Sequence, residues 1–157
     1  MDGYNLIGIY HEDLKRQRDM LIESLIAYRK RKGHDITVVF DGWKTGQGHE
    51  HHGVTGGVRV IYSGIGENAD AVIKRLVSSV KRQWIVITSD RDIADHAWSR
   101  DSVPVASEDF LRVISRREPP YDEKNGPSEE YHRPSGKGNP RRISKKAKAV
   151  GRALSKL

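Results

Sequence analysis

The stretch Thr37-Val38-Val39-Phe40-Asp41-Gly42 decides the predicted fold, because four apolar or β-branched residues run directly into a carboxylate and a glycine. A continuous apolar run of this length, followed by glycine, is typical of a strand that is buried on both faces. Asp41 then lies at the carboxyl end of that strand. Open α/β sheets bind ligands at this end, so the stretch predicts a functional site beside Asp41.

Three more acids occupy comparable positions in the sequence. Asp90 follows the apolar run 84–88, and Asp2 stands in the opening segment of the chain. Asp70 opens the helix that follows a third apolar run, residues 59–62. Because parallel strands end at the same edge of a sheet, we expect the four acids to converge on one rim.

Apolar periodicity predicts that strands and helices alternate along the chain. The first helix has acids in its first turn, basic residues in its last turn and Gly33 after its end, as helix termini favour. The alternation predicts an α/β fold, a three-layer α/β/α sandwich with a mainly parallel central sheet. The predicted elements are helices at 12–32, 69–80, 92–99 and from Ser107, and strands at 37–40, 58–62, 84–88 and 103–105.

Composition divides the chain into three parts. Residues 1–117 carry the predicted domain, and residues 118–142 form a linker of Pro, Gly, Ser and charged residues that has too little apolar surface to order itself. Residues 143–157 regain helical spacing of apolar residues. This pattern is typical of a basic amphipathic tail helix that becomes ordered on docking to the domain or to a polyanion.

The net charge of +7 is concentrated at the carboxyl end of the chain. Residues 134–157 hold eight basic residues and no acid, whereas the preceding residues hold 20 basic and 21 acidic ones. A basic tail on a nearly neutral body favours a nucleic-acid partner, and a solubilising tail is the alternative. The candidate RNA-binding residues are Arg141, Arg142, Lys145, Lys146, Lys148 and Arg152.

Several classes of protein are excluded by composition. The absence of cysteine excludes disulfides and thiolate metal sites. The sequence contains no apolar run of the length of a membrane span and no signal-peptide pattern, so we expect a cytoplasmic protein without a membrane partner.

The opening segment leaves two alternatives, because only Met1 precedes Asp2 and a buried first strand would lack its amino-terminal half. Either residues 5–10 supply the apolar residues of that strand, or the original start codon lies further upstream.

The segment 42–57 is rich in glycine and histidine, including His49, His51 and His52. We predict a flexible loop close to the substrate, because histidines on a glycine-rich loop have no preset geometry. A dedicated zinc or nickel site is the alternative.

Residues 64–69, Gly-Ile-Gly-Glu-Asn-Ala, follow a strand and open a helix, which is the layout of a dinucleotide-binding fingerprint. On this pattern the chain would be a dinucleotide-binding oxidoreductase. Glu67 and Asp70, however, place carboxylates where that motif holds a pyrophosphate, and they would repel it. The same acids favour a bound cation.

The acidic rim is predicted to be a metal site for Mg²⁺ or Mn²⁺, which prefer oxygen ligands. Four carboxylates in one cleft repel one another, and a divalent ion compensates that charge. The alternative for each acid taken singly is a helix cap or a loop turn. The candidate ligands are Asp2, Asp41, Asp70, Asp90 and Asp92, and the candidate supporting residues are Asn5, Thr88 and Ser89.

Four motifs in order resemble those of a known family. They are Asp2-Gly3-Tyr4-Asn5-Leu6-Ile7, Val38-Val39-Phe40-Asp41-Gly42, Val60-Ile61-Tyr62-Ser63 with Asn68-Ala69-Asp70, and Thr88-Ser89-Asp90. Together they are similar to the motifs of YacP-like NYN ribonucleases, relatives of the PIN domains, over about residues 1–115. The specificity lies in the order and spacing of the motifs.

The resemblance implies a PIN-like fold and a magnesium- or manganese-dependent endoribonuclease. Asp2, Asp41, Asp70 and Asp90 match the acidic positions of the family, and Asn5 matches its asparagine. Some relatives of this type act on RNA in connection with the ribosome. A catalytically inactive RNA-binding or ribosome-associated module is the alternative function.

Overall fold

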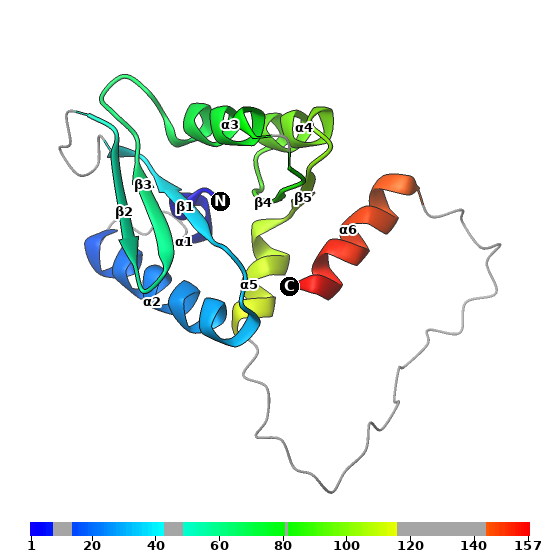
Figure 1. The fold of residues 1–157 in the computed structure, drawn as a ribbon, viewed down its shortest axis with the longest axis horizontal. Helices are drawn as coiled ribbons and strands as arrows, with labels where there is room; N and C mark the ends of the chain where they lie inside the picture. The colour runs from blue at the N-terminus through cyan, green and yellow to red at the C-terminus, as the bar shows by residue number, and fades with distance from the viewer. Residues whose placement is uncertain (8–13, 43–48, 81, 116–143) are drawn as a thin grey trace, which may run out of the picture.

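Strands and helices alternate along most of the chain in the computed structural model (Figure 1). The structure describes residues 1–7, 14–42, 49–80, 82–115 and 144–157, with the side chains of Tyr4 and Asn5 excepted. The helices are α1 (Gly3–Ile7), α2 (Leu14–Lys32), α3 (Ala69–Ser79), α4 (Arg91–Ser99), α5 (Ser107–Ser115) and α6 (Lys145–Lys156). The strands are β1 (Thr37–Phe40), β2 (His51–Thr55), β3 (Val58–Tyr62), β4 (Ile85–Ile87) and β5 (Val103–Val105).

The described strands form two sheets. The first has the order β1-β3-β2, in which β1 and β3 are parallel and β2 is antiparallel to β3. The second consists of the parallel pair β4-β5. The mixed α/β class is therefore confirmed, whereas the single, mainly parallel central sheet is not, because no strand ladder among the described residues joins β1 to β4.

The opening segment contacts β1 through its first two residues. Asp2 makes one parallel bridge with Val39, and the chain then turns directly into α1. Residues 5–7 are therefore helical and do not supply the apolar half of a strand, while residues 8–10 lie outside the described part. Met1 and Asp2 pair with β1 on the side that faces β4.

Strand β2 corrects the prediction of an unbroken loop between residues 42 and 57. Gly56 and Gly57 have φ angles of 56° and 86°, and two successive left-handed residues are what a tight hairpin turn requires. The hairpin pairs His52 with Ile61 of β3. Sequence reasoning missed β2 because its side chains are mostly exposed and histidine hides the alternation. Residues 43–48 lie outside the described part.

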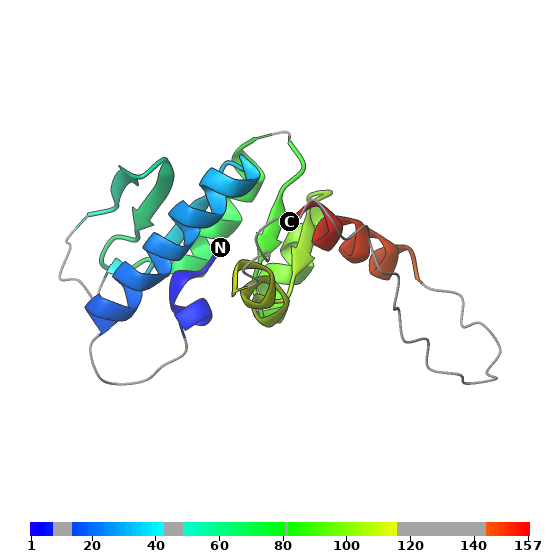
Figure 2. The ribbon, with the colours of Figure 1, turned by 90° about the horizontal axis from the view of Figure 1, so that it is seen from below.

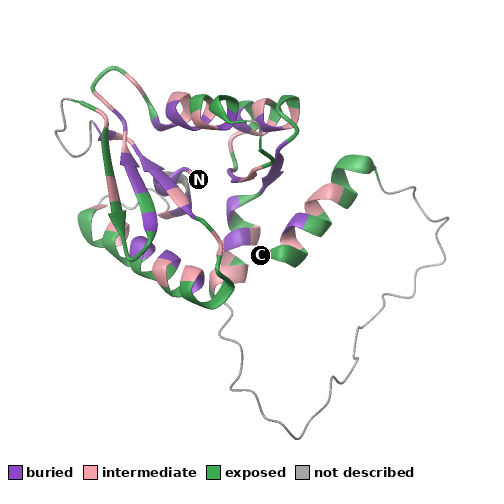
Figure 3. Ribbon diagram, viewed as in Figure 1, coloured by how far each residue is buried: buried purple, intermediate pink, exposed green. Residues whose placement is uncertain are grey.

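Strand β1 is buried over most of its length (Figure 3). Its side chains alternate between two apolar cores. Val38 and Phe40 pack with α2, whereas Val39 packs with α3 and α4. The second sheet contributes to the same two cores, since Ile87 joins the first and Val86 joins the second. The two sheets therefore share both cores and lie side by side.

Helix α6 lies at the end of the molecule opposite β2 in both views of the ribbon (Figure 1, Figure 2). Ala153 is buried, and Val150 and Leu154 pack against the first core. The hydroxyl of Tyr28 donates to the backbone oxygen of Leu157 at 2.6 Å. The amphipathic tail segment is thus a helix docked on the domain. None of the described helices has the length and apolar composition that a membrane span requires.

Candidate active site

Asp41 is fixed where β1 ends. Its Oδ1 accepts a hydrogen bond of 2.7 Å from the backbone N–H of Ala69, the first residue of α3. The next residue must be glycine, because a Cβ at position 42 would lie 1.7 Å from the backbone oxygen of Ser63. The N–H of Gly42 also donates to the Ser63 hydroxyl at 3.0 Å. The ends of β1 and β3 are thereby tied to the start of α3.

Asp90 is fixed by the same chemistry where β4 ends. It is the N-cap of α4, and its Oδ1 accepts from the N–H groups of Asp92 and Ile93 at 2.7 and 3.0 Å. Among the described residues, the second oxygen of Asp90 has no hydrogen-bond partner, and the same holds for Asp41. Each carboxylate is thus anchored by one oxygen and presents the other.

The pKa of Asp70, in the first turn of α3, is affected by the charges of both of these acids. Burial raises the pKa of Asp70, and the neighbouring charges of Asp90 and Asp41 raise it further. Asp92 acts in the same direction, whereas Lys74 lowers the pKa. Like charges shift one another's pKa only at short range. Four of the predicted ligands, from three chain segments, therefore share one electrostatic environment.

Lys74 is a member of this cluster that sequence reasoning missed. Its ammonium forms an ion pair with Asp92, and this hydrogen bond, together with the charges of Asp92, Asp70 and Asp90, raises the pKa of Lys74. Lys74 stands four residues after Asp70, a spacing that places two side chains on the same helix face. That spacing was the available signal. Lys74 offsets part of the negative charge.

Asp2 lies beside β1 but is less clearly part of the cluster. It is buried, and its bridge partner Val39 precedes Asp41 by two residues. A Cβ at Gly3 would lie 2.0 Å from the ring of Phe40, so the chain passes very close to β1 here. Asp2 is not among the charges that shift the pKa of Asp70. Its place among the ligands stays a prediction, and the side chain of Asn5 lies outside the described part.

The two predicted supporting hydroxyls hold the loop between β4 and α4. Thr88 accepts a hydrogen bond of 3.0 Å from the N–H of Asp90. Ser89 accepts one of 3.3 Å from the N–H of Ser107, at the start of α5. Both hydroxyls therefore support the position of Asp90 through backbone contacts.

The carboxylates fit a hard divalent cation in their chemistry. The free oxygens of Asp41 and Asp90 and the raised pKa of Asp70 indicate negative charge that Lys74 offsets only in part. In the described ranges, no three or more His, Asp or Glu side chains lie close enough to one another to hold a metal ion together. Bringing the ligands onto one ion therefore requires side-chain adjustment.

A dinucleotide does not fit the start of α3. Two of the N–H groups that would hold its pyrophosphate are taken, that of Ala69 by Asp41 and that of Ala71 by the Asn68 cap. Glu67 adds a carboxylate at this turn, where it forms an ion pair with Arg75. Helix N-termini bind phosphate through free N–H groups, so these contacts argue against the oxidoreductase alternative.

The comparisons with known proteins agree with this picture. The model of the YacP-like NYN domain matches residues 1–151. The chain belongs to this family. Among solved structures, it is similar to Rae1 (YacP) from Bacillus subtilis, with 26% identity and a TM-score of 0.57 over 72% of this chain and 70% of that one. A point mutant of Rae1 gives 25% identity and a TM-score of 0.60 over 72% and 71%.

No curated protein matches the chain by sequence. Membership of the NYN family indicates a nuclease-type function in RNA processing, and NYN nuclease domains are generally metal-dependent. The acidic cluster lies at the ends of β1 and β4 and at the start of α3.

The basic residues of α6 form a separate feature. Lys145, Lys146, Lys148 and Arg152 are exposed, and the ammonium of Lys146 lies 5.3 Å from the ring centre of Trp98. Arg141 and Arg142 lie outside the described part. The apolar side of the helix faces the domain, so its charged side is presented outward.

Proposed function

We propose that the chain is a divalent-metal-dependent endoribonuclease, with Asp2, Asp41, Asp70 and Asp90 as catalytic carboxylates and Mg²⁺ or Mn²⁺ as the ion. The observation that carries the proposal is the arrangement of Asp41 and Asp90, which are each bonded through Oδ1 to N–H groups at the start of a helix and lie close enough to Asp70 to raise its pKa. These acids come from three chain segments of a YacP-like NYN domain. Clustered carboxylates without matching cations are unfavourable unless a ligand compensates them.

Each carboxylate has a defined task in this proposal. Asp41 and Asp90 use one oxygen to bind backbone N–H groups, so the other oxygen of each would be available to hold the ion. A bound divalent ion would lower the pKa of a water molecule and stabilise charge that develops on phosphorus and the leaving oxygen. Asp70 contributes charge from α3, and Asp92 is the further ligand.

Lys74 competes with the ion for Asp92. While the ammonium pairs with Asp92, the charge of the cluster is partly offset without metal. An ion that took Asp92 as a ligand would free the ammonium of Lys74, which could then contact a phosphate oxygen. The ion pair therefore offsets part of the repulsion among the carboxylates in the absence of metal.

Helix α6 supplies phosphate contacts in this proposal. The exposed charges of Lys145, Lys146, Lys148 and Arg152 attract an RNA backbone without reading its sequence. Arg141 and Arg142 add to the same basic segment. RNA affinity would then depend strongly on salt, while the acidic cluster performs the hydrolysis.

The test is cleavage of a labelled, structured RNA by the full chain in Mg²⁺, in Mn²⁺ and in excess chelator. We expect internal cuts with either ion and none with chelator, and we expect activity to return when the ion is added back. RNA binding without cleavage under all ionic conditions would instead support the inactive RNA-binding or ribosome-associated module. Equal cleavage with chelator would contradict the metal-dependent mechanism.

A further inference from the structure

Three aromatic side chains form a row across the first sheet, where β1 and β3 end and β2 begins. Phe40 of β1 stands opposite Tyr62 of β3, and Tyr62 stands opposite His51 of β2. The ring centres of Phe40 and Tyr62 are 5.7 Å apart with planes at 23°, and those of Tyr62 and His51 are 6.5 Å apart with planes at 26°. These values are typical of offset stacking. We call these three side chains the ring row.

The ring row runs from the core to the surface. Phe40 is fully buried, Tyr62 is partly buried and His51 is exposed. Among the described strands, β2 pairs with β3 alone, so no further strand covers the outer side of His51. The row therefore ends in an imidazole on which another flat ring can stack.

The two histidines of β2 have different surroundings. Successive side chains of a strand point to opposite faces of the sheet, so His51 shares the α2 face with Tyr62, whereas His52 is on the α3 face. The carboxylate of Glu50 binds His52 at 2.5 Å and also pairs with Arg75 of α3. Contacts within the domain therefore explain His52, while the described residues give His51 only the ring of Tyr62.

Positive charge lies beside the ring row, because α2 crosses this face of the sheet (Figure 2). The guanidinium carbon of Arg18 is 5.5 Å from the ring centre of Tyr62. Lys15 and Arg16 precede it on α2 and are exposed. Asp19, at 4.0 Å from Nε of Arg18, offsets part of this charge. The first turns of α2 thus keep a net positive charge, which attracts a polyanion.

The ring row is connected to the acidic cluster through the end of β1. Asp41 directly follows Phe40 and is bonded to the start of α3, whereas Phe40 packs on the α2 side. The N–H of Ser63, next to Tyr62, donates to the backbone oxygen of Phe40 at 2.9 Å. The rings and the carboxylate therefore lie on the two faces of one strand end. An RNA strand that crosses this edge of the sheet can reach both.

We propose that His51 stacks on an unpaired base of single-stranded RNA, and so extends the ring row by one ring, while Lys15 and Arg16 attract the neighbouring phosphates. Aromatic side chains commonly hold unpaired bases in this way, and the contact tolerates any sequence because every base has a flat face. This inference rests on the proposed function, and it names the form of RNA that the candidate active site takes.

The test measures how tightly the full chain binds a short, unstructured oligouridylate in excess chelator, so that metal-dependent cleavage plays no part. His51→Val should weaken binding by about tenfold, because one stacked base is lost. His51→Tyr keeps a ring and should bind as the unmodified chain does. Both replacements favour strands, so β2 is retained in each. The salt dependence of binding should not change, since no phosphate contact is removed.

Two controls separate stacking from other effects. His52→Val removes the neighbouring imidazole from the opposite face and should bind oligouridylate normally. An RNA duplex offers no unpaired base, so its affinity should be the same for the unmodified chain and for His51→Val. Equal oligouridylate binding by the unmodified chain and His51→Val would overturn the proposal, as would an equal loss in His52→Val or in duplex binding. If the expected binding pattern were found without any cleavage in Mg²⁺ or Mn²⁺, the nuclease function would fail and the stacking site would stand.

Discussion

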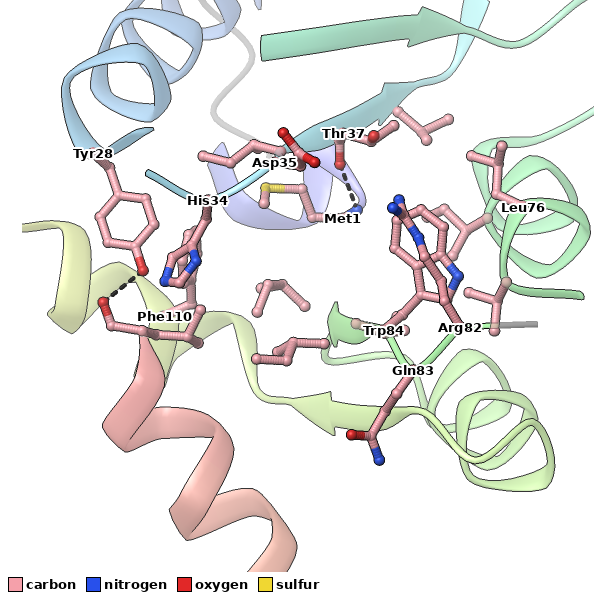
Figure 4. A pocket seen from close by; sticks show the side chains of 18 residues that line it. Met1, Tyr28, His34, Asp35, Thr37, Leu76, Arg82, Gln83, Trp84 and Phe110 are labelled. Atoms are coloured by element: carbon pink, nitrogen blue, oxygen red, sulfur yellow. Dashed lines mark hydrogen bonds between the residues drawn. The ribbon is translucent and has the colours of Figure 1, made fainter. Parts of the chain in front are cut away.

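The contacts that hold β1 and β4, with the opening segment beside them, differ sharply between the two ends of these strands. At their carboxyl ends, Asp41 and Asp90 are held by hydrogen bonds to backbone groups of α3 and α4. At their amino ends, β1 and β4 part around a cavity lined by Thr37, Val39, Ile85 and Ile87 (Figure 4). The difference shows that hydrogen bonds to the first N–H groups of helices fix the candidate active site even where the strands belong to two sheets. Such bonds can position a carboxylate without a continuous sheet.

Removal of one cluster charge should have the largest effect. Asp41→Asn keeps the size of the side chain but removes the charge that the proposed ion requires, so we expect cleavage to fall by about 100-fold or more. The measurement is kcat on a labelled RNA at saturating Mg²⁺. If the carboxyl ends of the strands hold the chemistry, the effect on Tm will be small by comparison.

The matched control is Asp19→Asn, an exposed acid on α2 that is not part of the cluster. It should cleave RNA as the unmodified chain does. Wild-type activity in Asp41→Asn would contradict the assigned chemistry, whereas equal losses in both variants would point to a general effect of charge.

The fold was predictable to the extent that local signals decide it. The end of α2 at Gly33, the cap at Asn68 and the strand ending at Asp41 follow from residue types and spacing. The hairpin strand β2 was missed because two glycines shape it, and its exposed side chains carry no apolar alternation. The division of the strands into two sheets depends on which strands pair across the fold. Residue patterns within each strand do not specify this pairing.

The same distinction holds for the candidate site. The gathering of Asp41, Asp70 and Asp90 was predictable because parallel strands end at one edge of a sheet, whereas the role of these acids stays a prediction. Lys74 was not predicted, because attention to strand ends leaves out the next turn of the helix. The contact between Asp41 and Ala69 joins residues 28 positions apart and appears only in three dimensions. Chain spacing predicts which residues gather, but not which oxygen is anchored.

The exposed basic residues of α6 allow RNA binding to be tested separately from both ends of β1 and β4. Replacing Lys145, Lys146, Lys148 and Arg152 with glutamine removes four exposed charges and should weaken RNA binding by about tenfold or more near 0.1 M salt. The slope of log affinity against log salt should become shallower by about 3, at roughly 0.7 per phosphate contact on single strands. The kcat at saturating RNA should change little, because the acidic cluster is intact.

The matched control exchanges lysine and arginine at the same four positions and so retains the charge. Its affinity and salt dependence should stay close to those of the unmodified chain. Substitution is a cleaner test than truncation, because α6 also packs on the domain through Ala153 and Leu157. Unchanged RNA affinity in the glutamine variant would remove α6 from the RNA-binding surface.

A smaller effect should show whether the cavity between β1 and β4 is independent of the candidate active site. Tyr28→Phe removes the hydroxyl that donates to the backbone oxygen of Leu157 beside this cavity. We expect the free energy of unfolding to fall by about 1 kcal/mol, the usual net contribution of one hydrogen bond. Denaturant unfolding measures the loss, and the RNA cleavage rate under native conditions should not change. A loss of cleavage without a loss of stability would mean that the two ends are coupled.

The smallest expected effect has the opposite sign. Asp70→Asn removes a carboxylate whose pKa is raised by burial and by Asp90, Asp41 and Asp92, with Lys74 acting against them. Because the folded pKa is above the unfolded one, Asp70 favours the native state when protonated, and that contribution is lost as pH rises through the folded pKa. Without divalent metal, the variant should therefore have a slightly higher Tm than the unmodified chain at neutral pH, and the difference should vanish below the unfolded pKa.

Divalent metal should reverse the order of the two Tm values, so that the unmodified chain is more stable than Asp70→Asn. An ion held by the carboxylates stabilises the chain that binds it, so Mn²⁺ should raise the Tm of the unmodified chain more than that of Asp70→Asn. Thermal scans at several pH values, with and without Mn²⁺, measure both effects on the same two proteins. A lower Tm for Asp70→Asn in metal-free buffer at neutral pH would show that Asp70 is already compensated by Lys74. In that case the carboxyl ends of the strands would be balanced without an ion, and the main electrostatic argument for a metal site would fail.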